Sequence, residues 1–269
     1  MIIFAVLLAL IFIWFSHRYA WWARRVPYSR PRILMYHMVR EPVAGAKFNG
    51  LRVKPAEFER QLAWLRDGGW HFVTMSELQA QRDTLAEKTV AITFDDGFED
   101  NYTYALPLLK RYGAKATLYL VTEREDNDWS SKKKAHHDSG ELQREPKLSD
   151  AQVQEMVDSG VFELGAHTLT HANLNALDLE AKTHEIQASK ALLERSFGVP
   201  VTSFAYPFGL YSQTDCELVS AAGFTNAVTT HGGVDEFPTD NWLELKRLKI
   251  SGKENLLAFK MRLSRGRRG

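Results

Sequence analysis

Two adjacent carboxylates, Asp95 and Asp96, end an apolar stretch of the sequence in the motif TFDDG. The preceding run 90–92 is typical of a buried strand, and Gly97 marks a sharp turn directly after the acids. Like charges at a strand end repel each other unless a cation neutralises one of them and leaves the other to act as a base. A plain turn is the alternative interpretation, because Asp-Asp-Gly alone is only moderately specific.

His167 and His171 form a second candidate pair, in the motif HTLTH after the strand-like run 161–165. A spacing of four residues can present both imidazoles to one ion on a helical turn or a tight loop. Two histidines and one carboxylate with open positions suit a divalent transition metal such as Zn²⁺. The pattern HExxH is absent, and two unrelated surface histidines would show the same spacing.

The elements that must position these residues alternate between strand-like and helical runs, which indicates parallel strand pairing. About seven such strands fit an α/β fold, a closed or nearly closed (β/α) barrel, better than an open sheet. His37 ends the first predicted strand, the acid pair ends the third, and the segment Tyr206–Phe208 follows a later one. Because the ends of parallel barrel strands meet at one rim, we expect these side chains to converge there.

Residues 1–23 are predicted to form a membrane-anchor helix. No charged side chain occurs through Phe15, and at about 1.5 Å per residue this run spans about 22 Å, short of the ~30 Å hydrocarbon core. Extension through Ala23 reaches about 34 Å if His17 and Arg18 extend to the interface. A signal peptide and a buried or interfacial helix are the alternatives; the positive charges follow the apolar run, whereas in signal peptides they precede it.

The rest of the chain divides into a linker at 24–31, a catalytic barrel at 32–252 and a basic C-terminal tail at 253–269. The polar segment 123–147 is predicted to be an inserted loop or lid, because a long loop after a barrel strand usually borders the active site. The tail is expected either to be solvated or to touch anionic lipid. A net charge of +1 gives no field that would attract nucleic acid, and nothing in the sequence predicts a protein partner.

Taken in order, the motifs TFDDG, HTLTH and FAYPFG resemble the first three motifs of the polysaccharide deacetylases, the NodB-homology or carbohydrate esterase family four enzymes. The resemblance covers about 32–250. It implies a distorted (β/α) barrel and the metal-dependent removal of N-acetyl, sometimes O-acetyl, groups from sugars. The early motif MYHMV is similar to the subset that contains the biofilm poly-N-acetylglucosamine deacetylases.

Carried over position by position, the resemblance implies that Asp95 is the general base and that Asp96, His167 and His171 hold the metal ion. The implied cofactor is a divalent ion, Zn²⁺ first, with Co²⁺, Ni²⁺ or Mn²⁺ as alternatives. Such an ion lowers the pKa of a bound water and polarises the acetyl carbonyl, so that a base beside it can activate the water.

Three further residues have supporting roles in this resemblance. Thr168 matches the Ser or Thr that steadies the loop after the first histidine. The backbone N–H of Phe208 matches the donor to the oxyanion that forms in the reaction, and Tyr206 is expected at the same oxyanion or substrate site.

The sequence departs from the family pattern in two places. Ala205 stands where the third motif usually has an arginine, and a clear C-terminal Leu-x-His motif is missing. Arg247 resembles an arginine in the final strand of the subset, and it is expected either to orient Asp95 or to form a surface salt bridge. For the general acid we expect His37, with His231 as the alternative.

The predicted function is therefore hydrolysis of the N-acetyl group of an N-acetylhexosamine in a cell-envelope polysaccharide, a lipopolysaccharide precursor or a lipid-linked sugar, with release of acetate. An O-acetyl esterase on polysaccharide and a non-catalytic carbohydrate-binding barrel are the alternatives. The predicted partners are an N-acetylated glycan or glycolipid and, through the N-terminal helix, a bacterial-type inner membrane. The positive charges after that helix favour a cytoplasmic body; a periplasmic or extracellular body is the alternative.

Overall fold

The computed structural model describes residues 2–19, 21–125 and 140–266. Its centre is a sheet of eight strands, seven of which close into a parallel barrel, because β1 pairs with β10 on one side and with β5 on the other. The predicted (β/α) barrel is confirmed. Around the barrel the strands are β1 (Arg32–Tyr36), β5 (Thr89–Asp96), β6 (Ala116–Leu120), β7 (Phe162–Ala166), β8 (Ser203–Ala205), β9 (Asn226–Gly232) and β10 (Leu245–Lys249).

Strand β4 (His71–Val73) lies outside this ring. It pairs with the first half of one edge of β5, from Thr89 to Ala91, whereas β6 pairs with the second half of that edge, from Ile92 onward. A separate two-stranded sheet, β2 (Met38–Val39) with β3 (Arg52–Val53), stands directly after β1 and extends the chain beyond the barrel rim.

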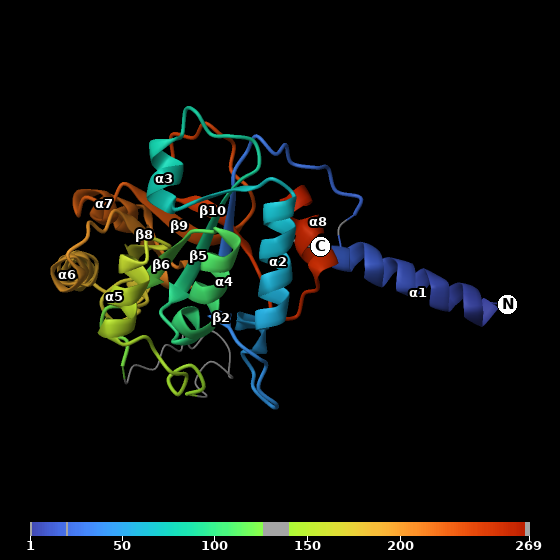
Figure 1. The fold of residues 1–269 in the computed structure, drawn as a ribbon, viewed down its shortest axis with the longest axis horizontal. Helices are drawn as coiled ribbons and strands as arrows, with labels where there is room; N and C mark the ends of the chain where they lie inside the picture. The colour runs from blue at the N-terminus through green and yellow to red at the C-terminus, as the bar shows by residue number, and fades with distance from the viewer. Residues whose placement is uncertain (1, 20, 126–139, 267–269) are drawn as a thin grey trace.

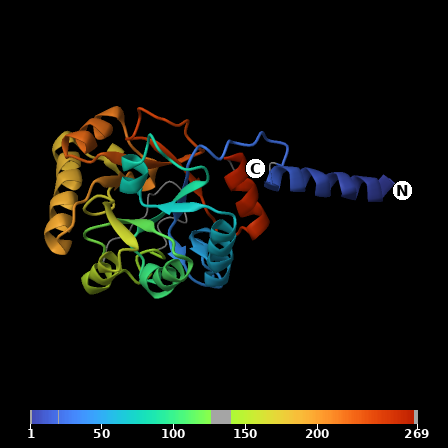
Figure 2. The same ribbon diagram turned by 45° about the horizontal axis from the view of Figure 1, so that its top comes forward.

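Helices surround the barrel and bury one apolar face against it (Figures 1 and 2). In α2, for example, Phe58, Leu62 and Leu65 recur at helical spacing and are buried. Capping starts several helices, as at Ser149, whose hydroxyl accepts from the N–H of Gln152. The surrounding helices are α2 (Pro55–Asp67), α3 (Met75–Ala80), α4 (Leu106–Tyr112), α5 (Asp150–Asp158), α6 (Leu179–Phe197), α7 (Gln213–Ala221) and α8 (Leu256–Arg265).

The barrel interior is packed with side chains and is closed at the end where the strands begin. Ile33, Ala91, Tyr119 and Leu245 belong to one buried cluster inside it. Helix α3 covers that end, where its N-terminal Met75 joins the cluster and its backbone N–H donates to Thr117. The opposite end, where the strands finish, is the rim that carries the predicted site.

Helix α1 (Ile2–Tyr19) projects away from the body of the protein, with its apolar side chains exposed (Figures 1 and 2). Its 18 residues give a length of about 27 Å, less than the ~30 Å hydrocarbon core of a bilayer. In the described parts of the chain, no helix is both long and apolar enough to cross a membrane. The predicted membrane anchor at 1–23 is therefore not supported, and the cellular location stays a prediction.

The two other flanking segments pack against the barrel more closely than their composition suggests. Helix α8 occupies most of the predicted basic tail at 253–269 and buries Phe259 and Leu263. Within the predicted linker, carbonyl groups accept hydrogen bonds from the buried guanidinium of Arg32, which also bonds the Leu263 carbonyl in α8. Most of the predicted lid at 123–147 lies outside the described residues, so that prediction stays open.

Candidate functional site

The site lies at the barrel rim, where three strands or the residues just after them deliver its side chains. Asp95 and Asp96 finish β5, His37 follows β1, and His167 follows β7. Backbone pairing places these strand ends side by side, because β5 pairs with β1 on one edge and with β6 on the other, and β6 pairs with β7. The convergence predicted from the order of strands and motifs is therefore found.

Asp96, His167 and His171 form a compact set of possible metal ligands. An oxygen of Asp96 lies 3.4 Å from the Nε2 atom of each histidine. All three side chains are buried, and their ligand atoms lie within 4.8 Å of one another. Although burial alone would raise it, the contacts of the carboxylate with His167 and His171 hold the pKa of Asp96 well below its ordinary value. An ionised carboxylate facing two imidazoles is a donor set that suits Zn²⁺ and similar ions.

The ring of His167 is oriented by a contact on its far side. Its Nδ1 atom lies 2.7 Å from the backbone carbonyl oxygen of Ala205. A carbonyl can only accept, so Nδ1 carries the proton and Nε2 presents its lone pair toward Asp96. Metal-binding histidines in proteins are usually held in this way, and this observation fits the residues to an ion.

The loop between the two histidines is held by hydrogen bonds to its own residues and to α6. The Thr168 hydroxyl accepts from the N–H of Ala172, 3.1 Å away, as expected for a residue that steadies this loop. Glu185 in α6 accepts from the N–H and the hydroxyl of Thr170. Glu185 was missed in the sequence, because nothing in its helical context distinguishes it from a surface acid.

Left-handed backbone conformations gather at this site. Among described residues other than glycine, five have a positive φ, and four of these are Asp96, Thr168, His171 and Phe208. Such conformations cost energy for residues with a Cβ atom, and they persist where surrounding contacts impose them. The backbone strain is therefore found at the residues that turn the possible metal ligands toward one another.

Asp95 forms a buried ion pair with Arg247 in β10. The two guanidinium nitrogens Nη1 and Nη2 donate to the two carboxylate oxygens over 2.6 and 2.7 Å. Arg247 also donates to the Thr93 hydroxyl and to the Thr229 carbonyl. Its side chain is fully buried, so the surface salt bridge considered for Arg247 is wrong and the alternative, that it orients Asp95, fits the geometry.

This ion pair also sets the charge state of Asp95. Burial works to raise the pKa of the carboxyl, but the charge and hydrogen bonds of Arg247 bring it below its ordinary value. Asp95 is therefore an anion at neutral pH. A carboxylate held in this form and in one orientation can accept a proton.

Tyr119 and Gly165 support Arg247 from inside the barrel, and both were missed in the sequence. The Tyr119 ring lies 5.8 Å from the guanidinium carbon of Arg247, at a distance typical of a cation–π contact. A Cβ atom at Gly165 would lie only 2.6 Å from the Tyr119 ring, so glycine leaves the space that this ring fills. The strand register pairs Tyr119 with Gly165, but one sequence alone does not reveal a register.

His37 lies in the electrostatic reach of both carboxylates. Burial lowers the pKa of His37, although the charges of Asp96 and Asp95 act in the opposite direction. Lys249 and Arg247, both in β10, add to the lowering. A neutral imidazole at neutral pH can take up a proton and pass it on, so His37 has the position and chemistry of an acid–base group.

His231 lies in a different environment from His37. It stands near the end of β9 in an exposed part of the strand, and its Nδ1 atom lies 3.4 Å from the hydroxyl oxygen of Tyr211. That hydroxyl donates to Glu244. Of the two histidines considered for the general acid, the geometry thus favours His37.

Of the two residues predicted for the oxyanion or substrate site, Phe208 lies at the site and Tyr206 does not. Phe208 has a φ of 59° within the turn η5 (Pro207–Gly209), and its ring packs on His171 with centroids 4.4 Å apart. Within the described chain its N–H has no hydrogen-bond acceptor, which leaves it available to an oxyanion. Tyr206 does not reach the site: its side chain is fully buried in the core, and its hydroxyl donates to the Cys216 sulfur.

Comparison with known proteins agrees with this geometry. The family model for polysaccharide deacetylase matches residues 82–227, more than half of the chain. The chain belongs to the polysaccharide deacetylase family. Members of this family are hydrolytic deacetylases, and the matched segment contains both acids of β5, both histidines and the turn η5.

Individual relatives extend the match beyond that segment. The Bacillus subtilis (strain 168) protein YxkH, whose name places it among the polysaccharide deacetylases, is 34% identical over 217 residues, 80% of this chain and 69% of its own. A poly-beta-1,6-N-acetyl-D-glucosamine N-deacetylase of Staphylococcus aureus (strain N315) is 26% identical over 64% of this chain and 58% of its own. The chain thus spans less than two thirds of that relative.

Among solved structures, the Streptococcus pyogenes deacetylase PplD, determined in complex with acetate, superposes with a TM-score of 0.73. It is 26% identical, and the superposition covers 89% of this chain and all of PplD. A polysaccharide deacetylase from Bacillus cereus, 27% identical, also gives 0.73 over 87% of this chain and 69% of its own.

Proposed function

We propose that this deacetylase removes the N-acetyl group from N-acetylhexosamine units of a polysaccharide and that it uses a divalent metal ion, Zn²⁺ before Co²⁺, Ni²⁺ or Mn²⁺. The observation that carries the proposal is the pairing of a buried ligand set, Asp96 with His167 and His171, with a separate, oriented carboxylate, Asp95. A barrel that only binds carbohydrate has no need for a base beside such a set.

The ligand set would hold the ion, which supplies Lewis acidity for the acetyl carbonyl and for a water molecule. Asp95 accepts the proton from the attacking water, while Arg247 keeps the carboxylate in place. The oxygen of water adds to the carbonyl carbon, and the N–H of Phe208 donates to the resulting oxyanion. His37 first takes up a proton and then donates it to the leaving nitrogen as the C–N bond breaks, so the products are acetate and a free amine.

The proposed substrate is a polymer that contains N-acetylglucosamine. It is supported by the Staphylococcus aureus relative, whose name specifies poly-beta-1,6-N-acetyl-D-glucosamine. Because that relative matches over only part of its length, the linkage of the polymer is part of the proposal.

The test is an assay of the purified protein on N-acetylglucosamine oligomers that counts free amines and released acetate together. Equal amounts of both products, lost with a chelator and restored by Zn²⁺, are expected. An O-acetylated polysaccharide is assayed in parallel. Acetate released from that substrate without any amine from the oligomers would replace the proposal with an O-acetyl esterase.

A further inference from the structure

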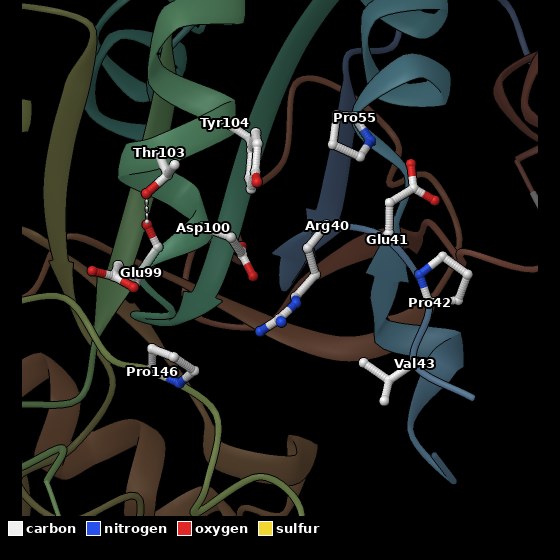
Figure 3. A pocket seen from close by; sticks show the side chains of 10 residues that line it. All are labelled: Arg40, Glu41, Pro42, Val43, Pro55, Glu99, Asp100, Thr103, Tyr104 and Pro146. Atoms are coloured by element: carbon white, nitrogen blue, oxygen red, sulfur yellow. Dashed lines mark hydrogen bonds between the residues drawn. The ribbon is translucent and has the colours of Figure 1, made fainter. Parts of the chain in front are cut away.

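A cavity of about 570 Å³ opens beside the same barrel rim, outside the catalytic residues (Figure 3). Its volume is in the range of small-molecule sites. Its walls come from the segment after β2, the start of α2 and the start of the helical turn η2 (Asn101–Ala105). We call it the Tyr104 cavity; its lining includes Arg40, Glu41, Pro55, Asp100, Thr103 and Tyr104.

The Tyr104 cavity lies close to the reaction centre along the chain. Arg40 is three residues beyond His37, so at about 3.6 Å per residue their Cα atoms are separated by at most about 11 Å. Asp100 is four residues beyond Asp96, which by the same limit allows at most about 14 Å. Two lining residues of the cavity therefore lie within about 14 Å of the catalytic residues, measured between Cα atoms.

The lining suits a hydroxylated ring better than an anion. Tyr104, which lines the cavity together with Pro55, exposes 45% of its surface and offers an aromatic face on which the apolar side of a sugar can pack. The positive charge of Arg40 is already paired with Glu145. The other charged groups of the wall, which include Glu41 and Asp100, are carboxylates, and these accept hydrogen bonds from hydroxyl groups.

Asp100 links the cavity to the chain segment that carries His37. Its side chain is 7% exposed, and its Oδ1 atom accepts hydrogen bonds from the N–H of Val39 and from the side chain of Asn101. Among the described residues nothing bonds to Oδ2, and Figure 3 shows the carboxylate pointing between Tyr104 and Arg40. Burial raises the pKa of Asp100 to about 7.

Asn101 provides a second connection between the cavity wall and the backbone of His37. It is fully buried, and its Nδ2 atom donates to the backbone carbonyl of His37 over 2.9 Å. The two backbone groups on either side of Met38 are thus held by Asp100 and Asn101, one by each. Asp100 and Asn101 are therefore placed to position His37, because they fix the backbone of the residue that protonates the leaving amine.

We propose that the Tyr104 cavity binds a neighbouring sugar unit of the polymer, next to the unit that loses its acetyl group. The ring of this unit packs on Tyr104 and its hydroxyl groups donate to Asp100, which then holds the His37 segment more firmly. The role of His37 rests on the proposed function; the binding of the sugar does not. Contacts with this remote sugar unit of the substrate are then expected to raise kcat as well as to lower KM.

The first test measures binding in the Asp95→Asn protein, which cannot consume the probe. Calorimetry with a β-1,6-linked tetramer of N-acetylglucosamine is compared before and after Tyr104→Ala. A loss of one aromatic contact is expected to weaken the tetramer about fivefold. Leu257→Ala, which removes another exposed apolar side chain, in α8, is the matched control and is expected to leave the dissociation constant as it was. Equal binding by the protein with and without Tyr104→Ala would overturn the sugar site, whatever the protein hydrolyses.

The second test measures turnover. In the otherwise unchanged protein, the ratio of kcat/KM for the tetramer to kcat/KM for the monosaccharide is expected to fall about fivefold on Tyr104→Ala. An unchanged ratio would contradict the proposal. If no substrate is turned over by the parent protein, the proposed function fails and the binding result still decides the cavity.

The third test separates positioning from folding. Asp100→Ala removes the acceptor for the Val39 N–H and is expected to lower kcat about tenfold, the effect of one hydrogen bond. Asp100→Asn keeps an oxygen there and is expected to recover most of that loss. Metal content and the urea midpoint are measured for both variants. Equal kcat values in the two variants would refute the positioning role.

Discussion

Replacement of Arg247 by methionine tests the buried ion pair on which the proposed base depends. The two hydrogen bonds of 2.6 and 2.7 Å join side chains that are 0% and 4% exposed, so the Asp95 charge would remain buried without its partner. Removal of one member of such a pair costs about 3–5 kcal/mol of unfolding free energy. We expect Arg247→Met to lose an amount in this range.

The assay is urea unfolding in the presence of a chelator, so that neither metal binding nor activity contributes. Arg111→Met is the matched control, because Arg111 bonds Glu59 in an ion pair whose side chains are 64% and 37% exposed. Exposed pairs contribute about 0–1 kcal/mol, so this variant should lose no more than that.

A double-mutant cycle gives the decisive comparison. Arg247→Met combined with Asp95→Asn removes both charges, so the double variant should lose at least about 1 kcal/mol less than the sum of the single losses. If the three losses add within about 0.5 kcal/mol, the residues do not interact and the orientation of Asp95 by Arg247 is refuted.

Three more outcomes are expected. His171→Ala should lose the bound ion, as measured by elemental analysis, whereas Asp95→Asn should keep the ion and lose turnover; full occupancy in the first variant would remove His171 from the ligand set. His37→Ala should keep the ion and lower kcat at least about 100-fold, and a near-normal rate would transfer the acid role to another group. Gly165→Ala should lower the unfolding free energy by about 1–3 kcal/mol, because its Cβ would lie 2.6 Å from the Tyr119 ring; an unchanged urea midpoint would show that the ring has room to move.

The sequence predicted those parts of the site that are local in the chain. Asp95 and Asp96 are neighbours, and His167 and His171 are four apart, so each pair is visible as a motif. The alternation of strands and helices then predicted that the pairs share a rim, and the barrel confirms this.

The contacts that the sequence could not specify join distant residues. Arg247 reaches Asp95 across 152 positions, and whether it is buried depends on how the barrel closes. The role of Gly165 depends on its register opposite Tyr119. Composition misled at the C-terminus, where α8 carries Lys260, Arg262 and Arg265 but still buries Phe259 and Leu263, together with Arg262.

The packed interior of the barrel restricts how a long glycan can approach. Tyr119 and its neighbours fill the space below the rim, and α3 closes the opposite end, so no passage runs through the molecule. A polymer cannot be threaded through the barrel and has to lie across its open face. Such contact requires no chain end, so interior units of the glycan can reach the site as well as terminal ones.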